Sequence, residues 1–196
     1  MAFSKVMKAR AVTIDATIMF ADLRGYTALT QRIDQPALTS LLDAFYDDCA
    51  SAIWRYDGLL NKTIGDAAFA IFNFPVRQED HALQAVLAAR EIQQRFSARR
   101  EELTRNTVLS EGEVEIGVGI GIDSGMTNFG EFGHAHRDLT AVGTVVNRAA
   151  RAQSVAKTGE ILVTSQVRDR AGGVIDGGGH DYVLKGFREP ITLFRV

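Results

Sequence analysis

Residues 59–72 read LLNKTIGDAAFAIF, and this stretch predicts the central hairpin of the fold. Two runs, 59–64 and 67–72, are rich in apolar and β-favouring side chains. Between them lies Gly65-Asp66, a pair typical of tight turns. We therefore expect a strand, a turn and a second strand, with Lys62 pointing out of the first strand and Asp66 in the turn.

The segments on either side of the hairpin predict two long helices. Asp34 is a good N-cap, Pro36 suits a first helical turn, and Gly58 is placed to end the first helix. A second helix is expected from about residue 79 to 99. Helical spacing gives the first helix one apolar stripe, formed by Leu38, Leu41, Leu42, Phe45, Cys49, Ala52 and Ile53.

Apolar runs and alternation predict further strands. A strand over 16–21 stops at Asp22, and residues 114–122 alternate strictly, which indicates a strand with one buried face. We interpret Asp123-Ser124-Gly125 as a turn and 126–130 as the hairpin partner that follows it. The glycines among residues 117–121 are expected to permit close packing. The remaining expected elements are a strand over 138–142, a helix over 144–155, and strands over 160–163, 181–184 and 191–196.

The predicted order, βαββαβ with a C-terminal extension, is that of a ferredoxin-like α+β sandwich. We expect one open antiparallel sheet with helices on one face. Residues 1–12 are interpreted as an N-terminal linker stub, and residues 13–196 as the folded domain. The fold alone gives no function, because such folds host many activities.

Composition sets the class of protein. The chain has 196 residues, of which 46% are hydrophobic and 23% charged, and this balance is typical of a globular domain. The formal net charge of −2 argues against nucleic acid or a membrane surface as partner. A single cysteine, Cys49, rules out a disulfide framework within one chain, and the sequence has no apolar run long enough to span a bilayer.

Two carboxylates fall where strands end or turn, Asp22 and Asp66. In the predicted topology the first strand lies beside the central hairpin, so both side chains could meet at one edge. Neighbouring carboxylates repel unless a cation lies between them, and Mg²⁺ suits few carboxylates together with substrate phosphates. The alternative is that Asp22 caps the next helix and Asp66 only fills a turn.

Other polar positions are compatible with a nucleotide. Residues 23–27 join a strand to a helix, where backbone N–H groups can hold phosphate. Asn147 and Arg151 are four residues apart on one predicted helix and share a face, which suits a ribose and a phosphate. The alternative is a solvated helix face. Lys62 and Lys185, each taken alone, would simply be solvated lysines.

Taken together, these segments resemble the motifs of the class III adenylate and guanylate cyclase catalytic domain. The resemblance covers almost the whole chain, from about residue 17 to 196. Its four parts, in order, are 20–27 (FADLRGYT), 62–67 (KTIGDA), 138–143 (DLTAVG) followed by 146–151 (VNRAAR), and 184–186 (LKG). They are similar to the first metal motif, the purine-lysine and second metal motif, the purine and transition-state segment, and the terminal phosphate-lysine motif.

The resemblance implies a role for each matching residue. Asp22 and Asp66 would bind two metal ions, Mg²⁺ or Mn²⁺, per active site. Asn147 would orient the ribose, and Arg151 would stabilise charge in the transition state. The residues that would bind substrate are Lys62 and Thr140 at the purine, Lys185 at the terminal phosphates, and Leu23, Gly25, Tyr26 and Thr27 in the turn.

The resemblance also implies a homodimer with two equivalent sites, because the family's sites lie at the dimer interface. The metal aspartates come from one subunit and the other groups from its partner. The chain would then be a cytoplasmic adenylate cyclase, or lie on the cytoplasmic face of a membrane if membrane domains precede it. An upstream regulatory domain is a further hypothesis.

The substrate prediction rests on Lys62 and Thr140. A lysine can donate to N1 of adenine but would face the N1–H donor of guanine, which favours ATP. Threonine at 140 resembles the subgroup in which bicarbonate stimulation is described, so bicarbonate regulation is a hypothesis. Arg148 departs from the family, which more often has an apolar residue there. The alternatives are a guanylate or dual-specificity cyclase, and a non-catalytic dimerisation or nucleotide-sensing module.

Overall fold

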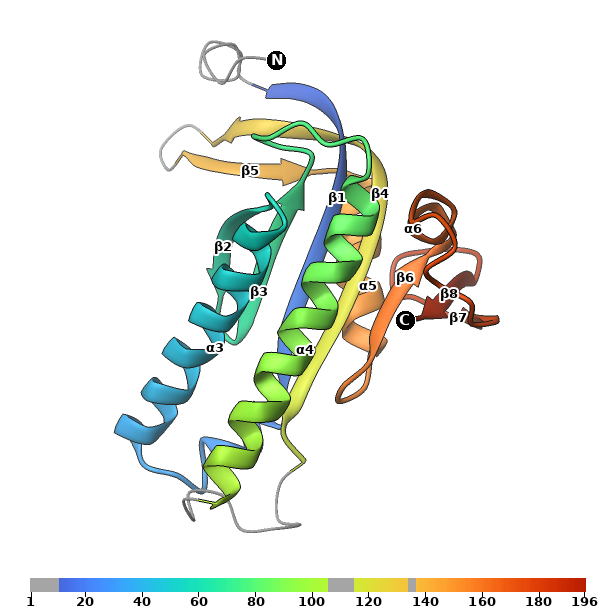
Figure 1. Cartoon of the computed structure of the whole chain (residues 1–196). Helices are drawn as coiled ribbons and strands as arrows, with labels where there is room; N and C mark the ends of the chain where they lie inside the picture. Colours follow the sequence, from blue (N-terminus) through green and yellow to red (C-terminus); the bar gives the residue numbers. More distant parts are fainter. Residues whose placement is uncertain (1–10, 106–114, 134–136) are drawn as a thin grey trace.

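The computed structural model describes residues 11–105, 115–133 and 137–196 (Figure 1). Residues 1–10 of the expected linker stub lie outside this part of the chain, and its residues 11 and 12 begin the first strand. Within it, eight strands form one sheet in the order β2-β3-β1-β4-β6-β8-β7, with β5 paired to β4 off this path. The strands are β1 (Ala11–Arg24), β2 (Leu59–Ile64), β3 (Ala67–Phe72), β4 (Gly117–Phe132), β5 (Asp138–Val142), β6 (Ile161–Thr164), β7 (Gly179–Tyr182) and β8 (Ile191–Arg195).

The central hairpin is confirmed at both strands. β2 and β3 pair antiparallel around the Gly65-Asp66 turn, where Gly65 has φ of 61°. A positive φ is the conformation that glycine adopts without steric cost. The Tyr46 hydroxyl donates a hydrogen bond to the Gly65 carbonyl and so ties the turn to the first long helix.

The two long helices are also confirmed, with different ends. Helix α3 spans Gln35–Arg55, and the Asp34 side chain caps it by accepting from the Ala37 N–H at 2.9 Å. It ends at Arg55, before Gly58. Helix α4 spans His81–Arg105, several residues beyond the expected end. The shorter helices are α2 (Tyr26–Leu29), α5 (Thr144–Val155) and α6 (Ser165–Arg170).

The predicted turn at residues 123–125 is wrong. β4 runs unbroken from Gly117 to Phe132, paired with β1 from Ala11↔Gly130 to Arg24↔Gly117. The polar residues that resemble a turn are buried, and Asp123 accepts hydrogen bonds from the Ser124 N–H at 2.8 Å and the Thr164 hydroxyl at 2.6 Å. A polar group whose hydrogen bonds are satisfied can stay inside a strand.

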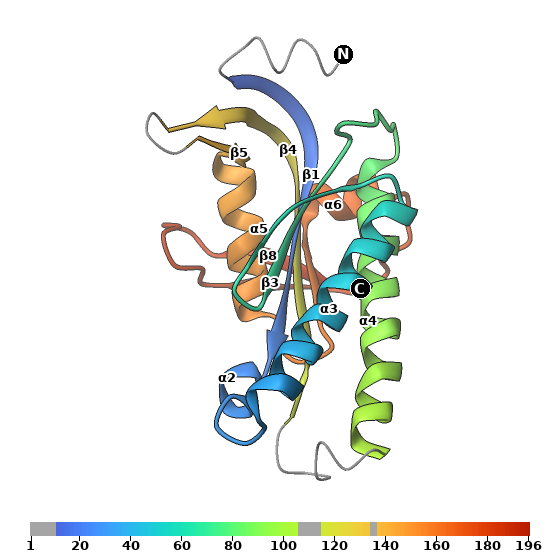
Figure 2. The same ribbon diagram turned by 90° about the vertical axis from the view of Figure 1, so that its left-hand side faces the viewer.

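The expected single layer of helices and wholly antiparallel sheet are wrong as well. Helices α3, α4 and α6 cover one face and α5 covers the other (Figure 2), and β4 pairs with β6 in parallel. The cause lies in β1, whose alternate residues are apolar on both sides. Met19 and Ala21 pack toward α3 and α4, whereas Ala16 and Ile18 pack toward α5. Both faces therefore need cover from water.

Helix α5 lies directly on β4 at Gly121. A Cβ atom there would stand 2.0 Å from the Gln153 nitrogen and 2.4 Å from the Ala149 carbonyl oxygen. The glycine is thus what allows the helix backbone to touch the strand, as expected from the glycines of 117–121. No helix among the described residues has both the length and the apolar character needed to cross a bilayer.

Candidate active site

The structure brings Asp22 and Asp66 to one edge of the sheet, which we call the carboxylate edge. Asp22 lies near the end of β1, opposite Ala67 of β3. The Leu23 N–H donates to the Asp66 carbonyl at 3.1 Å, so the hairpin turn is fixed against β1. The sequence-predicted meeting of these two residues at one edge follows from this β1–β3 pairing.

The carboxylate edge carries more negative charge than its neighbours balance. Burial raises the pKa of Asp22, and the negative charge of Asp66 raises it further, while Arg24 and Gln153 act in the opposite direction. Arg24 Nη1 lies 2.8 Å and Gln153 Nε2 lies 2.7 Å from Asp22 Oδ2. Two carboxylates thus face one guanidinium at this edge, an arrangement that leaves room for a further cation.

Arg24 also joins the carboxylate edge to the end of α5. Its Nε donates to the Ala156 carbonyl at 2.9 Å, and its Nη2 donates to the Gln153 carbonyl. These carbonyls lie at the helix C-terminus, where free acceptors and the helix dipole favour a cation. One guanidinium therefore contacts both Asp22 and α5.

The predicted phosphate turn adjoins the same edge. Gly25 has φ of 78° and precedes α2, whose first residues are Tyr26 and Thr27. Leu23 is buried and its N–H is bonded to Asp66, so it is engaged in the fold. Gly25, Tyr26 and Thr27 are the members of the turn that stand at the helix start.

A second polar cluster, which we call the base corner, forms where β5 meets β2. Lys62 forms an ion pair with Asp138. Asn61 Nδ2 donates to the Leu139 carbonyl at 2.9 Å, and the Thr140 hydroxyl donates to Asn61 Oδ1 at 3.2 Å. The structure thus brings Lys62 and Thr140 together, although they are 78 residues apart in the sequence.

Helix α5 presents Asn147 and Arg151 outward. Both residues are exposed, while Val145, Ala149 and Ala152 are buried on the opposite face. The sequence-predicted face is therefore present on the helix.

Arg148 points inward from α5 instead, and its Nε lies 2.6 Å from Oδ2 of the fully buried Asp123. This contact accounts for the departure at 148, because the arginine pairs with an acidic residue of β4 where an apolar residue would pack.

Lys185 stands apart in the C-terminal extension. It is exposed and follows the buried Leu184, after β7. Among the described residues, no hydrogen bond or ion pair joins Lys185, Asn147 or Arg151 to the carboxylate edge.

Sequence reasoning missed four polar residues of these clusters: Arg24, Gln153, Asn61 and Asp138. Arg24 and Asp138 lie inside the quoted motifs. The sequence therefore shows their charges, but it does not show which residues they contact. Gln153 and Asn61 lie beside the motifs. The contact of Gln153 depends on how α5 packs against the sheet, and those of Asn61 depend on how close β5 lies to β2. No local sequence pattern predicts either arrangement.

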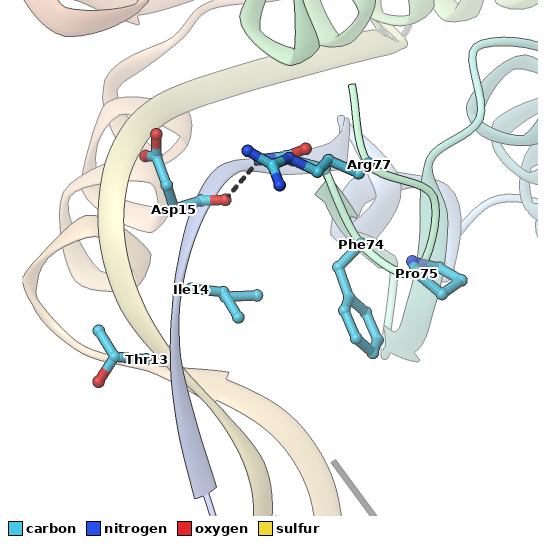
Figure 3. Close-up of a pocket in the computed structure, with 7 residues that line it drawn as sticks. Thr13, Ile14, Asp15, Phe74, Pro75 and Arg77 are labelled. Atoms are coloured by element: carbon cyan, nitrogen blue, oxygen red, sulfur yellow. Dashed lines mark hydrogen bonds between the residues drawn. The ribbon is translucent and has the colours of Figure 1, made fainter. Parts of the chain in front are cut away.

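A separate cleft of about 210 Å³ lies on the other half of β1, beside the loop after β3 (Figure 3). Asn73 Nδ2 donates to the Asp15 carbonyl across it at 2.9 Å. None of the sequence-predicted site residues lines it. Its walls are Thr13, Ile14, Asp15, Asn73, Phe74, Pro75 and Arg77.

Comparison with known proteins identifies a family. Residues 10–177 match the adenylate and guanylate cyclase catalytic domain. An adenylate cyclase of Anabaena cylindrica is 32% identical over 160 residues, which cover 80% of this chain and 31% of that protein. The chain thus spans about a third of the length of the curated relatives that it matches first.

Two solved structures share the fold closely. The adenylyl cyclase CyaB of P. aeruginosa has a TM-score of 0.89 at 26% identity, covering 96% of each chain. The guanylyl cyclase Cya2 has a TM-score of 0.86 at 25% identity, covering 96% of this chain and 94% of that one.

Proposed function

Because the chain belongs to the adenylate and guanylate cyclase catalytic domain family, we propose that it is an adenylate cyclase converting ATP to 3′,5′-cyclic AMP and pyrophosphate. The observation that carries the choice of ATP is the base corner. Lys62 supplies N–H donors there, and adenine N1 is an acceptor whereas guanine N1 bears a hydrogen. Thr140 lies beside it as a hydroxyl partner.

The carboxylate edge fits divalent cations. Two carboxylates, Asp22 and Asp66, supply the hard oxygen ligands that Mg²⁺ and Mn²⁺ prefer, and Arg24 is the one cation paired with Asp22 among the described residues. We propose that the two residues hold two such ions. When bound, the ions lower the pKa of the attacking 3′-hydroxyl and neutralise the phosphates.

The remaining residues position and stabilise. Asn147 would orient the ribose so that its 3′-oxygen is in line with the α-phosphorus, and Arg151 would meet the charge that develops on the α-phosphoryl oxygens. Lys185 would hold the terminal phosphates, together with the N–H groups of Gly25, Tyr26 and Thr27. The bond from the α-phosphorus to the bridging oxygen breaks as the new ester forms, and pyrophosphate leaves.

A homodimer would complete the site. Asn147 and Arg151 face outward from α5, and no contact among the described residues connects them to Asp22 or Asp66. We propose that a second copy of this chain supplies the aspartates opposite them, giving two equivalent sites. Specific activity should then fall on dilution. Constant specific activity down to a monomer measured by light scattering would contradict the proposal.

The deciding experiment is the product made from each triphosphate. Purified protein with Mn²⁺ should form cyclic AMP from ATP faster than cyclic GMP from GTP at equal concentrations. The solved structure of a guanylyl cyclase at a TM-score of 0.86 makes the guanylate reaction the second candidate. Faster formation of cyclic GMP would favour it, and no product from either triphosphate would favour a non-catalytic nucleotide-sensing domain.

The proposal has four further parts. They are a cytoplasmic location, an upstream regulatory domain, regulation by bicarbonate, and a catalytic domain that extends over residues 13–196.

A further inference from the structure

We infer that Asn61 is a specificity-positioning residue, which orients the Thr140 hydroxyl so that the base corner accepts a hydrogen bond from a 6-amino purine. The inference rests on the proposed function and names a residue that none of the motifs assigns. It is carried by two hydrogen bonds that the Asn61 amide makes to neighbouring residues of β5.

The first bond fixes which way the amide points. A backbone carbonyl can only accept, so the amide atom 2.9 Å from the Leu139 carbonyl oxygen has to be Nδ2. Oδ1 then faces Thr140, with 3.2 Å between Oδ1 and the hydroxyl oxygen. The amide orientation thus follows from the hydrogen-bond pattern, which is the proper basis for assigning it.

The second bond fixes the direction of the hydroxyl proton. Amide Oδ1 has no hydrogen to give, so Thr140 has to donate to it. A hydroxyl has one hydrogen and two lone pairs, so only lone pairs remain for a ligand. Thr140 therefore offers an acceptor, which suits the amino group of adenine and opposes the 6-keto oxygen of guanine or hypoxanthine.

Lys62 supplies the complementary donor. Its ammonium group donates one hydrogen bond to Asp138, and its other two N–H groups remain for an acceptor such as adenine N1. The corner then presents one donor and one acceptor for the two adjacent groups of adenine. A purine with the reversed pattern would place its keto oxygen against the lone pairs of Thr140 and its N1–H against the donors of Lys62, and such mismatches are how polar sites reject close analogues.

The test measures selectivity at C6 with ATP and inosine 5′-triphosphate, because hypoxanthine differs from adenine at N1 and C6 and lacks the 2-amino group of guanine. With the full chain and Mn²⁺, kcat/KM for each is measured in wild type, Asn61→Ala and Asn61→Asp. Asn61→Ala frees the Thr140 hydroxyl to rotate and donate to the keto oxygen. We expect its ATP-to-ITP ratio to fall about tenfold.

Asn61→Asp distinguishes two roles of Asn61: orienting the Thr140 hydroxyl, and holding β5 in place through the bond to the Leu139 carbonyl. Aspartate keeps an acceptor for Thr140 but loses the donor to Leu139, so the ratio should stay within about twofold of wild type. A supporting role alone would make both variants lose selectivity alike. Gln93→Ala is the matched control, because Gln93 Nε2 likewise donates to a backbone carbonyl, that of Val118 at 2.8 Å, and Gln93 lies on α4, outside the base corner.

Thr140→Val provides a second measurement should Asn61→Ala fail to fold. It should lower the ratio to the same extent, and adding Asn61→Ala should lower it no further. An unchanged ratio in Asn61→Ala and Thr140→Val, or an equal loss in Asn61→Asp, would overturn the inference. A wild type that does not distinguish ATP from ITP would also overturn the inference. A wild type that forms cyclic GMP from GTP faster than cyclic AMP from ATP would instead overturn the proposed function, so the two failures are distinguishable.

Discussion

The carboxylate edge and the base corner treat charge in opposite ways. At the edge, Asp22 and Asp66 lie together with Arg24 as the paired cation, and the pKa of Asp22 remains raised. At the corner, the ammonium of Lys62 meets the carboxylate of Asp138, and Asn61 satisfies Thr140. One region has charge left to be neutralised, and the other has only directed hydrogen bonds left to offer. The first suits metal and phosphate, and the second suits an uncharged base.

Helix α5 connects these two regions. It begins at Thr144, directly after β5 of the base corner, and near its end Gln153 donates to Asp22. Between them, Arg148 anchors the helix to the buried Asp123. The contrast between the regions can therefore be tested at either end of α5 and at its middle.

The largest effect should come from removing a charge at the carboxylate edge or on the outward face of α5. Asp22→Ala, and equally Arg151→Ala, should lower the rate of cyclic AMP formation by about a thousandfold or more, because each removes a charge that we propose to act in the transition state. A mixture of the two variants should regain activity through one intact site per heterodimer. Asp47→Ala, which changes an exposed carboxylate of α3, should keep activity.

Absence of recovery in that mixture, with heterodimers confirmed by tagged pull-down, would contradict the division of roles between subunits. Recovery would place the edge and the outward face of α5 in different subunits of one site.

The next largest effect concerns the anchor of α5. Arg148→Met leaves the Asp123 carboxylate buried without its cation, so the free energy of unfolding should fall by about 3–5 kcal/mol. Urea denaturation at a fixed protein concentration would measure it. Adding Asp123→Asn should restore part of the loss, because it removes the buried charge and keeps an acceptor for the Ser124 N–H and the Thr164 hydroxyl. Arg137→Met, at a largely exposed pair with Glu131, should change little. If Arg148→Met and Arg137→Met lowered the free energy of unfolding equally, Arg148 would not be an anchor of α5.

A smaller effect is expected at the base corner. Lys62→Met should lower kcat/KM for ATP about tenfold through the lost donor to the base. It should leave the unfolding midpoint nearly unchanged, because the Asp138 side chain is 49% exposed and water can solvate it. A large loss of stability would show that the corner supports the fold as much as it reads the base.

The smallest effect is on stability at the carboxylate edge. The pKa of Asp22 is higher in the folded chain than its ordinary value, so the folded state favours the protonated form and stability declines as pH rises from that ordinary value. With metal chelated, Asp22→Asn should therefore raise the free energy of unfolding at pH 7 by about 1 kcal/mol or less, and a higher melting temperature would report it. The gain should shrink toward pH 4. If the stability gained by Asp22→Asn instead grew as the pH fell, the pKa of Asp22 would have to be lowered in the folded chain, which would contradict this prediction.

Local patterns predicted the elements that local chemistry decides. The 59–72 hairpin and the bounds of α5 follow from alternation, a glycine turn and helical spacing, and the structure places them as expected. The turn at 123–125 failed because its residues are polar and small, as turn residues are, while their partners come from β6 and α5.

The site divides in the same way. Asp22, Asp66, Lys62 and Thr140 were recognisable as members of motifs, but the groups that tune them were not. Arg148 illustrates the reason: its partner Asp123 lies 25 residues earlier on another strand, and only the seating of α5 on β4 brings them within 2.6 Å. Such contacts are set by tertiary packing, which sequence spacing does not encode.

The long pairing of β1 with β4 has a mechanical consequence. β1 runs from Ala11, where the described chain begins, to Arg24, two residues beyond Asp22, and it stays in one register with β4 throughout. If β1 slid along β4 by one residue, every side chain of β1 would turn to the opposite face of the sheet. The pairing therefore opposes any small sliding of the two strands along each other. We therefore expect a displacement of β1 at Ala11 to move the paired strand as a unit, Asp22 included, and not to be absorbed by a change of register.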